Sequence, residues 1–340
     1  MKSRIAHSLP PDKPSADTPC PICSNRKAIE CSRGRDRLFG LAQGAFPLFR
    51  CISCGCIFQH PFPDRDTLAG FYPQQYWWGE ESKNADRWDR LFQKLEKAYR
   101  EFVVADHVRF LERFGRSHAP EGGKLLDIGC GSGTFLHVAQ SRGFTPHGMD
   151  SSPQAVKVAH SQYSFDVRRG EIGEGIWAEQ RFDFITMFHV LEHLTDPRMG
   201  LKYAGKLLQP NGMLIIQVPN VGSIQARVFG RSWYGLDVPR HVINYSPRAL
   251  GILLQDMGFE YRLMSRFSLR DNPASIASSL VPWLDPIRLK GRRLHPHPIF
   301  NGAMEAAYFA LFLLALPAAY LESACGAGGT IWACAWRRKP

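Results

Sequence analysis

A glycine-rich turn between a short apolar run and a helix start constrains this chain more than any other feature. The run Lys124–Ile128 has the length and composition of a buried strand, and the pattern predicts a helix over 132–142. The turn between them, 127–133, carries glycine at positions 129, 131 and 133. Glycine tolerates positive φ and lets a ligand touch bare backbone, and the helix start adds free N–H groups. The turn therefore predicts a nucleotide-type pocket at the carboxyl end of a first parallel strand.

The spacing of these glycines indicates which ligand the pocket takes. A dinucleotide fingerprint needs glycine at 134, where this chain has Thr134, and the Gly-Lys-Ser/Thr of a phosphate-binding loop is absent. The pattern D-x-G-x-G-x-G, beginning at Asp127, resembles motif I of the class I S-adenosylmethionine-dependent methyltransferases. Asp150, at the end of a second strand, and the apolar run Phe182–Phe188 resemble the family's next blocks in order.

The resemblance covers residues 120–268 and a last strand, Thr330–Arg337. It implies an α/β fold with a doubly wound, Rossmann-like sheet of seven strands, and S-adenosyl-L-methionine as the cofactor. In that family the first turn holds the amino-acid end of the cofactor, and the acidic residue after the second strand binds the ribose. Residues after the third strand approach the adenine, and the end of the fourth strand flanks the methionine part. The matching positions here are Asp127, Gly129, Cys130, Gly131, Gly133, Asp150, Glu171, Phe188 and His189.

Two C-x-x-C pairs near the amino terminus form a second strong pattern. The polar, proline-rich start of the sequence leads us to expect no secretory signal, and nine cysteines then favour a reducing cytosol and metal ligation over disulfides. Cys20 and Cys23, together with Cys51 and Cys54, offer the complete ligand set of a structural Zn²⁺ site. Cys56 is an alternative to Cys54, and a thioredoxin-like redox pair would need a βαβ unit that neither pair has. The segment resembles the zinc-binding module ahead of some methyltransferase domains, including sugar C-methyltransferases.

Two histidines are the candidates for proton transfer in a methyl-transfer site. Displacement at a sulfonium releases a neutral leaving group, so alignment in a dry site is the main requirement. A base is needed only when the acceptor must lose a proton. The candidates are His193, one turn beyond the fourth strand, and His241, in a loop that lies over the active site in related sequences. For both, the alternative is a structural role as a cap, a core hydrogen-bond partner or a loop histidine bound to backbone.

Residues 189–193 also spell H-x-x-E-H, an inverted metalloprotease motif. That motif needs both histidines on one uninterrupted helix. Here His189 directly follows an apolar strand, and Pro197 breaks the chain soon after His193. We therefore disfavour the metalloprotease interpretation.

Composition divides the chain into segments of different character. They are a polar, proline-rich leader that we expect to be disordered (1–19), a zinc-ribbon-like module (20–80), a linking amphipathic helix (81–119), the methyltransferase core (120–272), a basic and apolar insertion (273–326), and a last strand with a basic tail (327–340). The apolar run 306–321 is shorter than a spanning helix, and we expect Pro317 to interrupt it. We therefore expect 298–321 to meet a membrane interface, the substrate or another subunit rather than to span a membrane.

The net charge of +11 favours a negatively charged partner. Nucleic acid is disfavoured because the basic residues are scattered rather than interleaved with aromatic ones, which leaves an anionic membrane surface or a phosphorylated acceptor. We predict a cytoplasmic methyltransferase, at most peripheral at the inner face of the membrane. Its acceptor would be an oxygen or carbon of a small-molecule, sugar-nucleotide or glycolipid-type compound. The alternatives are an RNA methyltransferase, whose RNA affinity would fall steeply with salt, and a non-catalytic zinc-module adaptor, which would bind no cofactor.

Overall fold

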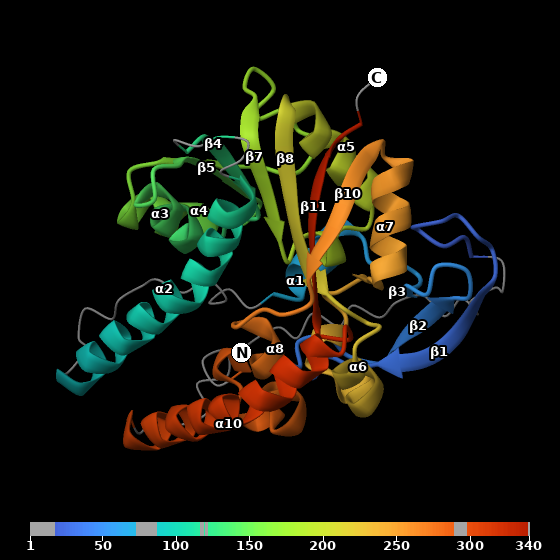
Figure 1. Ribbon diagram of the computed structural model, residues 1–340. Coiled ribbons are helices and arrows are strands. Elements are labelled where there is room, and N and C mark those ends of the chain that lie inside the picture. Colours follow the sequence, from blue (N-terminus) through green and yellow to red (C-terminus); the bar gives the residue numbers. More distant parts are fainter. Residues whose placement is uncertain (1–17, 73–86, 116–118, 120–121, 289–297, 339–340) are drawn as a thin grey trace.

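The structure is a computed structural model that describes residues 18–72, 87–115, 119, 122–288 and 298–338 (Figure 1). Within these ranges, only the backbone is described for 87–100 and 298–301. Most of the predicted leader, the end of the predicted zinc module and the basic residues near position 290 lie outside the described residues.

A mixed sheet of seven strands forms the centre of the molecule, in the order β10-β11-β8-β7-β4-β5-β6 (Figure 1). The strands are β4 (Lys124–Ile128), β5 (Thr145–Asp150), β6 (Asp166–Arg169), β7 (Phe182–Phe188), β8 (Leu208–Pro219), β10 (Phe259–Ser265) and β11 (Thr330–Arg337). The neighbours from β8 through β6 pair in parallel, whereas β11 is antiparallel to both β8 and β10. The strand order reverses at β4, which is the switch point where ligands bind in such sheets. The predicted doubly wound fold is therefore confirmed.

Helices cover both faces of this sheet. They are α2 (Arg87–Gly115), α3 (Thr134–Gln140), α4 (Pro153–Gln162), α5 (Pro197–Leu207) and α7 (Pro247–Asp256). The first three pack into one buried apolar cluster and the last two into another. Alternation along the strands separates the clusters, because Leu125 of β4 faces the first and Leu126 the second. The helix predicted over 132–142 is shorter, since the turn occupies its first residues.

Short polar residues set the starts of three of these helices. Ser152, Asp196 and Ser246 each precede a proline at the first helical position. Each side chain accepts a hydrogen bond from the N–H three residues further on. These caps satisfy donors at the helix starts that no helical carbonyl reaches.

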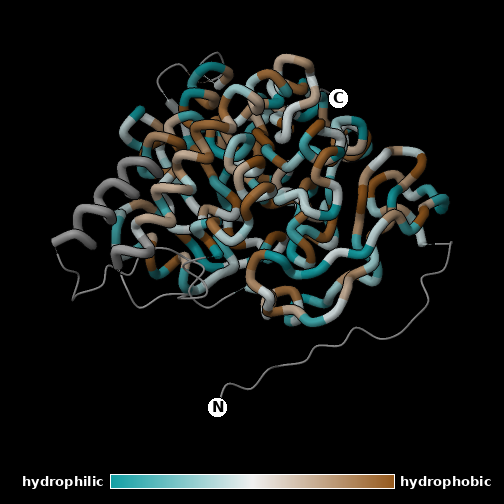
Figure 2. Tube along the Cα trace, turned by 90° about the horizontal axis from the view of Figure 1, so that it is seen from below, coloured by the Kyte–Doolittle hydropathy of each residue, from teal (hydrophilic) through white to brown (hydrophobic). Residues whose placement is uncertain are grey.

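A smaller sheet holds the amino-terminal module and includes one strand from the core. It consists of β1 (Ala28–Gly34), β2 (Phe46–Cys51), β3 (Ile57–Gln59) and β9 (Ile243–Asn244), in that order. The hairpin of β1 and β2 is the one that the cysteine spacing predicts. Ser246 donates a hydrogen bond to the Cys54 carbonyl at 2.9 Å, and a short helix, α1 (Arg65–Gly70), follows β3. The module therefore packs directly on the core, to one side of the main sheet in both views (Figures 1 and 2).

The insertion near the carboxyl end is largely helical. α8 (Asp271–Leu280) packs against α10 (Pro298–Ala324), and α6 (Ile224–Phe229) bonds to α10 through Gln225 and Glu322 (Figure 1). α10 continues through Pro317, so the expectation that this proline interrupts the apolar run was wrong. Pro317 has no N–H to bond to the Leu313 carbonyl, yet the helix runs on to Ala324.

The expectation that this segment is shorter than a membrane-spanning helix was also wrong. Among the described residues, 302–324 is the one helix that is long and apolar enough to cross a membrane. Only 17% of its most apolar window is buried. Continuation through the proline, rather than a change in composition, explains the added length.

Candidate cofactor and acceptor site

The glycine-rich turn after β4 takes the backbone conformation that its sequence predicts. The φ angle is 78° at Gly129, 54° at Gly131 and 81° at Gly133, values that residues with a Cβ rarely adopt. A Cβ on Gly129 would also lie 2.6 Å from Cγ2 of Val190. Larger residues are therefore excluded for conformational and steric reasons, and a bare backbone leads into α3.

Two buried aspartates organise the turn from the adjacent strand ends. Asp150, the last residue of β5, accepts hydrogen bonds from the N–H of Gly131 at 2.9 Å and of Ser152 at 2.8 Å. Asp127 of β4 accepts the hydroxyl hydrogen of Thr186 at 2.6 Å, and burial raises the pKa of Asp127 to about 7. Together the aspartates tie β4, β5 and β7 to the turn.

The other residues predicted to bind the cofactor lie in different settings. Cys130 is buried within the turn. Phe188, at the end of β7, packs edge-on against Phe135 of α3 with ring centroids 5.0 Å apart. Glu171 forms an ion pair with Arg65 of α1. Their roles toward a cofactor stay predictions.

His189 lies between two carboxylates at the end of β7. Its φ is 55°, in the left-handed region. Nδ1 is 3.0 Å from Oε1 of Glu192, and Nε2 is 3.3 Å from Oδ2 of Asp271. Burial disfavours the charged ring, but the Asp271 and Glu192 carboxylates outweigh it and raise the pKa of His189 to about 10. His189 is therefore protonated at neutral pH and cannot accept a proton from a substrate.

Asp271 belongs to a buried network that sequence analysis missed. The Gln217 amide donates to Asp271 at 2.6 Å, and its oxygen is 2.7 Å from Nε2 of His107. The Ser268 hydroxyl donates to the same Asp271 carboxylate at 2.6 Å. These residues come from α2, β8 and the start of α8, so no local pattern brings them together. Gln217 within the apolar run 213–219 was the available signal, because a buried amide needs partners.

Glu192, His193 and His241 gather near His189. One nitrogen or oxygen of each lies within 4.8 Å of the others. Nδ1 of His193 lies 2.9 Å from the Tyr72 hydroxyl and 3.1 Å from the Arg240 carbonyl. Nδ1 of His241 lies 2.8 Å from the Gly235 carbonyl, and a carbonyl only accepts, so this nitrogen of His241 carries a proton. The structure thus brings the two predicted histidines together, with ring centroids 4.7 Å apart.

The surroundings of this cluster set its protonation. Burial, together with the neighbouring His241, lowers the pKa of His193 to about 4, so its ring is neutral at pH 7. Glu192 is fully buried, and its Oε2 has no hydrogen-bond partner among the described residues. An unpartnered buried carboxylate oxygen marks a position for a polar group of a ligand or for a water.

The turn that carries His193 is too short for a metalloprotease motif. η1 (Leu191–His193) is a single 3₁₀ turn, and His189 precedes it with a left-handed backbone. His189 and His193 therefore do not share a helix, which agrees with the interpretation that the sequence favoured.

Four sulfurs form a compact cluster in the amino-terminal module. The Sγ atoms of Cys20, Cys23, Cys51 and Cys54 all lie within 4.8 Å of one another, and the Cys20–Cys54 and Cys23–Cys51 pairs are both 3.6 Å apart. Zn–S bonds of about 2.3 Å in a tetrahedron put the sulfurs roughly 3.8 Å apart. The four free thiols therefore fit a zinc ion. Cys56 is 3.4 Å from the Cys20 and Cys54 sulfurs but stands outside the set of four.

Comparisons with known proteins agree with this geometry. The family described as methyltransferase domain matches residues 95–263. The ubiquinone biosynthesis O-methyltransferase of Azorhizobium caulinodans is 32% identical over 147 residues, covering 41% of this chain and 58% of that protein. The protein of the same name from Cereibacter sphaeroides is 30% identical over 171 residues, covering 47% of this chain and 68% of that protein.

Solved structures give a weaker likeness. The crystal structure of the plantazolicin methyltransferase BpumL, in complex with a triazolic desmethylPZN analog and SAH, is 15% identical. It has a TM-score of 0.47 and covers 75% of this chain and 92% of that chain.

The chain belongs to the methyltransferase domain family, on the strength of the Cereibacter relative and the family match over the central sheet. More narrowly, its strand order and glycine turn are those of the class I S-adenosylmethionine-dependent methyltransferases. The match spans 58% of the Azorhizobium relative and 50% of a Caulobacter relative of the same name.

Proposed function

We propose that this protein transfers a methyl group from S-adenosyl-L-methionine to an oxygen or carbon of a small-molecule, sugar-nucleotide or glycolipid-type acceptor. The observation that carries the proposal is the turn of three positive-φ glycines bonded to the Asp150 carboxylate. The names of the relatives, ubiquinone biosynthesis O-methyltransferases, favour an oxygen of a small molecule among these acceptors.

The cofactor would lie across the turn at the carboxyl ends of β4 and β5. Asp127 and the three glycines would hold its amino-acid end, and Asp150 its ribose hydroxyls. Glu171 would lie on the adenine side, and Phe188, His189 and Cys130 beside the methionine part and the turn. The sulfonium supplies an electrophilic methyl group and leaves as a neutral thioether. The protein's own residues would therefore align the acceptor with the methyl group and exclude water from the site.

His193 is the proposed base for an acceptor that must lose a proton. Its neutral ring offers a nitrogen lone pair at pH 7, whereas His189 is already protonated. His241 lies beside it and would share or relay the proton. The unpartnered oxygen of Glu192 would then stabilise the imidazolium that forms.

The four-cysteine cluster is proposed to hold a structural zinc ion. All four protein ligands would be sulfurs, which leaves no open position for a substrate. The ion would hold the two knuckles of the amino-terminal module together, close to Ser246 of the core, which bonds to the Cys54 carbonyl.

We further propose a cytoplasmic protein that meets an anionic membrane surface through α10. Leu313, Leu314 and Leu321 on this helix are 48%, 77% and 63% exposed, and Trp283 beside the helix is 59% exposed. Apolar side chains of this size insert into the interface between head groups and acyl chains. Such a position would suit a glycolipid-type acceptor.

Calorimetric titration of the purified protein with S-adenosylhomocysteine tests the proposal, with NADH as the control ligand. We expect micromolar binding of S-adenosylhomocysteine and none of NADH. Acceptor screening would then begin with sugar nucleotides and lipid-linked glycans, with release of S-adenosylhomocysteine as the readout. Folded, zinc-loaded protein that fails to bind S-adenosylhomocysteine would contradict the proposal and favour the adaptor alternative.

A further inference from the structure

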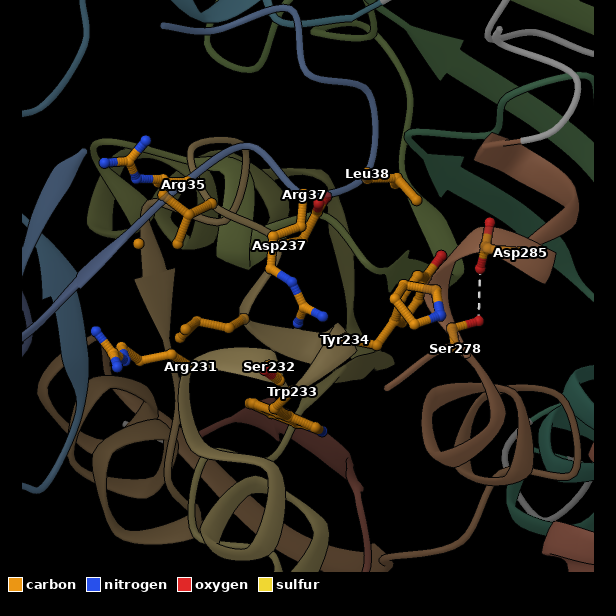
Figure 3. A pocket seen from close by; sticks show the side chains of 14 residues that line it. Arg35, Arg37, Leu38, Arg231, Ser232, Trp233, Tyr234, Asp237, Ser278 and Asp285 are labelled. Carbon is orange, nitrogen blue, oxygen red and sulfur yellow. Dashed lines mark hydrogen bonds between the residues drawn. The ribbon is translucent and has the colours of Figure 1, made fainter. Parts of the chain in front are cut away.

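A narrow cleft beside the acceptor cluster is lined by three exposed arginines, of which Arg37 points toward the centre of the cleft and Arg35 and Arg231 point outward at its edge (Figure 3). Arg35 and Arg37 follow β1 in the amino-terminal module, and Arg231 lies in the 3₁₀ turn after α6. The remaining walls come from Gly34 and Leu38 beside the first two arginines, from most of the segment 232–238, and from the end of α8 with the turn that follows it. The free volume is about 40 Å³, enough for a few water molecules, and the cleft opens to solvent.

The three arginines carry charges that the protein itself does not neutralise. Among the described residues, no carboxylate lies within salt-bridge distance of Arg35, Arg37 or Arg231. Partial burial of the guanidinium lowers the pKa of Arg37. Arginine remains charged at neutral pH despite such a shift.

Both carboxylates that line the cleft are already engaged. Asp237 pairs with the buried Arg240 at 2.6 Å. Asp285 accepts the Ser278 hydroxyl hydrogen at 2.5 Å, the dashed line in Figure 3, and the N–H groups of Ile287 and Arg288. The lining as a whole therefore has an unbalanced positive charge, which favours an anionic ligand.

Buried polar contacts hold the walls of this cleft in place. Asp36, between Arg35 and Arg37, is buried and pairs with Arg240 at 2.9 Å. It also accepts hydrogen bonds from the N–H groups of Phe39 at 3.1 Å and Leu41 at 2.7 Å. The loop that presents the two arginines is therefore anchored from inside the protein. A scattered surface patch would lack such support.

The opposite wall is anchored in the same way. The indole N–H of Trp233 donates to Gln225 at 3.1 Å, and the Gln225 amide donates to the buried Glu322 of α10 at 2.8 Å. The Tyr234 N–H donates to Ser279 of α8 at 2.8 Å. The carboxyl-terminal insertion thus forms part of the cleft, and both walls are pre-organised.

The cleft adjoins the proposed acceptor site through shared residues. Asp237 lines the cleft, and its Oδ2 is 4.0 Å from Nε2 of His241. The neighbouring Gly235 carbonyl holds the other nitrogen of the same ring. A group bound among the arginines would therefore be next to the histidines.

We propose that this cleft binds a phosphate group of the methyl acceptor, so that the acceptor is a phosphate ester or diphosphate. The inference rests on the proposed methyltransferase function and names the substrate class for it. Guanidinium groups suit phosphate oxygens because their rigid fork of N–H donors matches the geometry of the anion. A nucleotide-linked compound in solution and a lipid-linked phosphate share this chemistry.

Calorimetric titration with inorganic pyrophosphate, in the full chain saturated with S-adenosylhomocysteine, tests the proposal. We expect Arg37→Ala and Arg231→Ala each to weaken pyrophosphate binding about tenfold or more, because each loses charged hydrogen bonds. Arg262→Ala is the matched control, since Arg262 is an exposed arginine of β10 outside the cleft. S-adenosylhomocysteine should bind all variants equally.

Two outcomes would overturn the subsite and leave the methyltransferase proposal intact. They are normal cofactor binding with no pyrophosphate binding, and pyrophosphate binding that Arg37→Ala and Arg231→Ala leave unchanged. Loss of cofactor binding in the wild-type protein would instead contradict the function on which the inference rests.

Two further probes identify the source of the phosphate. Uridine diphosphate in solution represents a nucleotide-linked acceptor, and phosphatidylcholine vesicles with added phosphatidic acid represent a lipid-linked one. Binding of the first that Arg37→Ala abolishes supports a soluble acceptor. Arg37-dependent binding of the second supports a lipid-linked one. If neither probe competes with pyrophosphate, the assignment to an acceptor phosphate fails.

Discussion

Asp150 connects the end of β5 to the glycine turn through the Gly131 and Ser152 N–H groups. In the proposed complex its carboxylate also accepts hydrogen bonds from ribose hydroxyls. We predict that Asp150→Ala weakens S-adenosylhomocysteine binding about tenfold or more, as expected for loss of bonds to a charged acceptor. Calorimetry measures the affinity, and circular dichroism checks that the fold is kept. Asp166→Ala, at the exposed start of β6, is the control. Unchanged affinity would remove Asp150 from the ribose role.

The charge on His189 predicts how stability depends on pH. Its folded-state pKa is about 10, above the ordinary value of 6.5, so the native state binds more protons between these values. The stability that protonated His189 contributes to the folded state is fully present below pH 6.5 and is lost as the pH rises through about 10. We therefore predict that the free energy of unfolding of the wild-type protein falls across this window.

His189→Asn should flatten that dependence, because the titrating group is gone and asparagine tolerates the positive φ. Asp271→Asn should flatten it as well, because Asp271 is the main charge that raises the pKa of His189. Urea unfolding at a series of pH values gives the comparison. Parallel curves for the three proteins would show that His189 is not held in its charged form.

At the scale of elements, the amino-terminal module depends on two knuckles that meet at one cluster. We predict that Cys20→Ser with Cys23→Ser releases one zinc ion per chain and loosens the module, since half of the ligands are removed. Mass-spectrometric metal analysis measures the zinc content. Cys31→Ser is the control, because Cys31 is exposed and outside the cluster. Wild-type protein that contains no zinc would contradict the zinc-site proposal. Loss of zinc in Cys56→Ser would indicate that Cys56, rather than Cys54, is the fourth ligand.

The exposed face of α10 predicts vesicle binding. We expect Leu314→Ser with Leu321→Ser to reduce co-sedimentation with anionic vesicles several-fold, because both side chains lie free on the helix surface. Ile29→Ser on β1 is the control, since Ile29 is 58% exposed but lies in the amino-terminal module. Wild-type protein that does not sediment with anionic vesicles would contradict the membrane proposal.

For the molecule as a whole, a buried ion pair joins the amino-terminal module to the core. Arg240 bonds to Asp36 at 2.9 Å and also donates to the Phe71 carbonyl at 3.2 Å. Asp237 also pairs with Arg240 at 2.6 Å, so removing the Asp36 charge takes away one of two carboxylate partners, and loss of a hydrogen bond between charged groups costs about 1.5–3 kcal/mol. We predict a loss of this size in the free energy of unfolding for Asp36→Asn, measured by urea denaturation. Glu30→Gln, which breaks an exposed ion pair with Arg33, should change it little. A comparable loss in both variants would contradict the role of the buried pair.

Elements with a strong local pattern could be predicted from the sequence. The strands β4, β7 and β11 and the positive φ of the turn glycines follow from apolar runs and glycine spacing, which act over a few residues. The length of α10 could not be predicted, because proline usually ends a helix, whereas α10 continues through Pro317. The addition of β9 to the amino-terminal sheet is likewise a contact between distant segments.

The sequence by itself therefore determined the fold class, the place of the cofactor turn and the pairing of cysteines into two knuckles. Each of these depends on residues that are close in the chain, so spacing and side-chain chemistry suffice. The tertiary structure alone decided which histidine is charged. His189 meets Asp271 and so keeps its proton, whereas His193 is buried beside His241 and loses it. It also decided that Arg37 and Arg231, nearly two hundred residues apart, line one cleft. Protonation and electrostatic complementarity depend on distance in space, which only the folded chain defines.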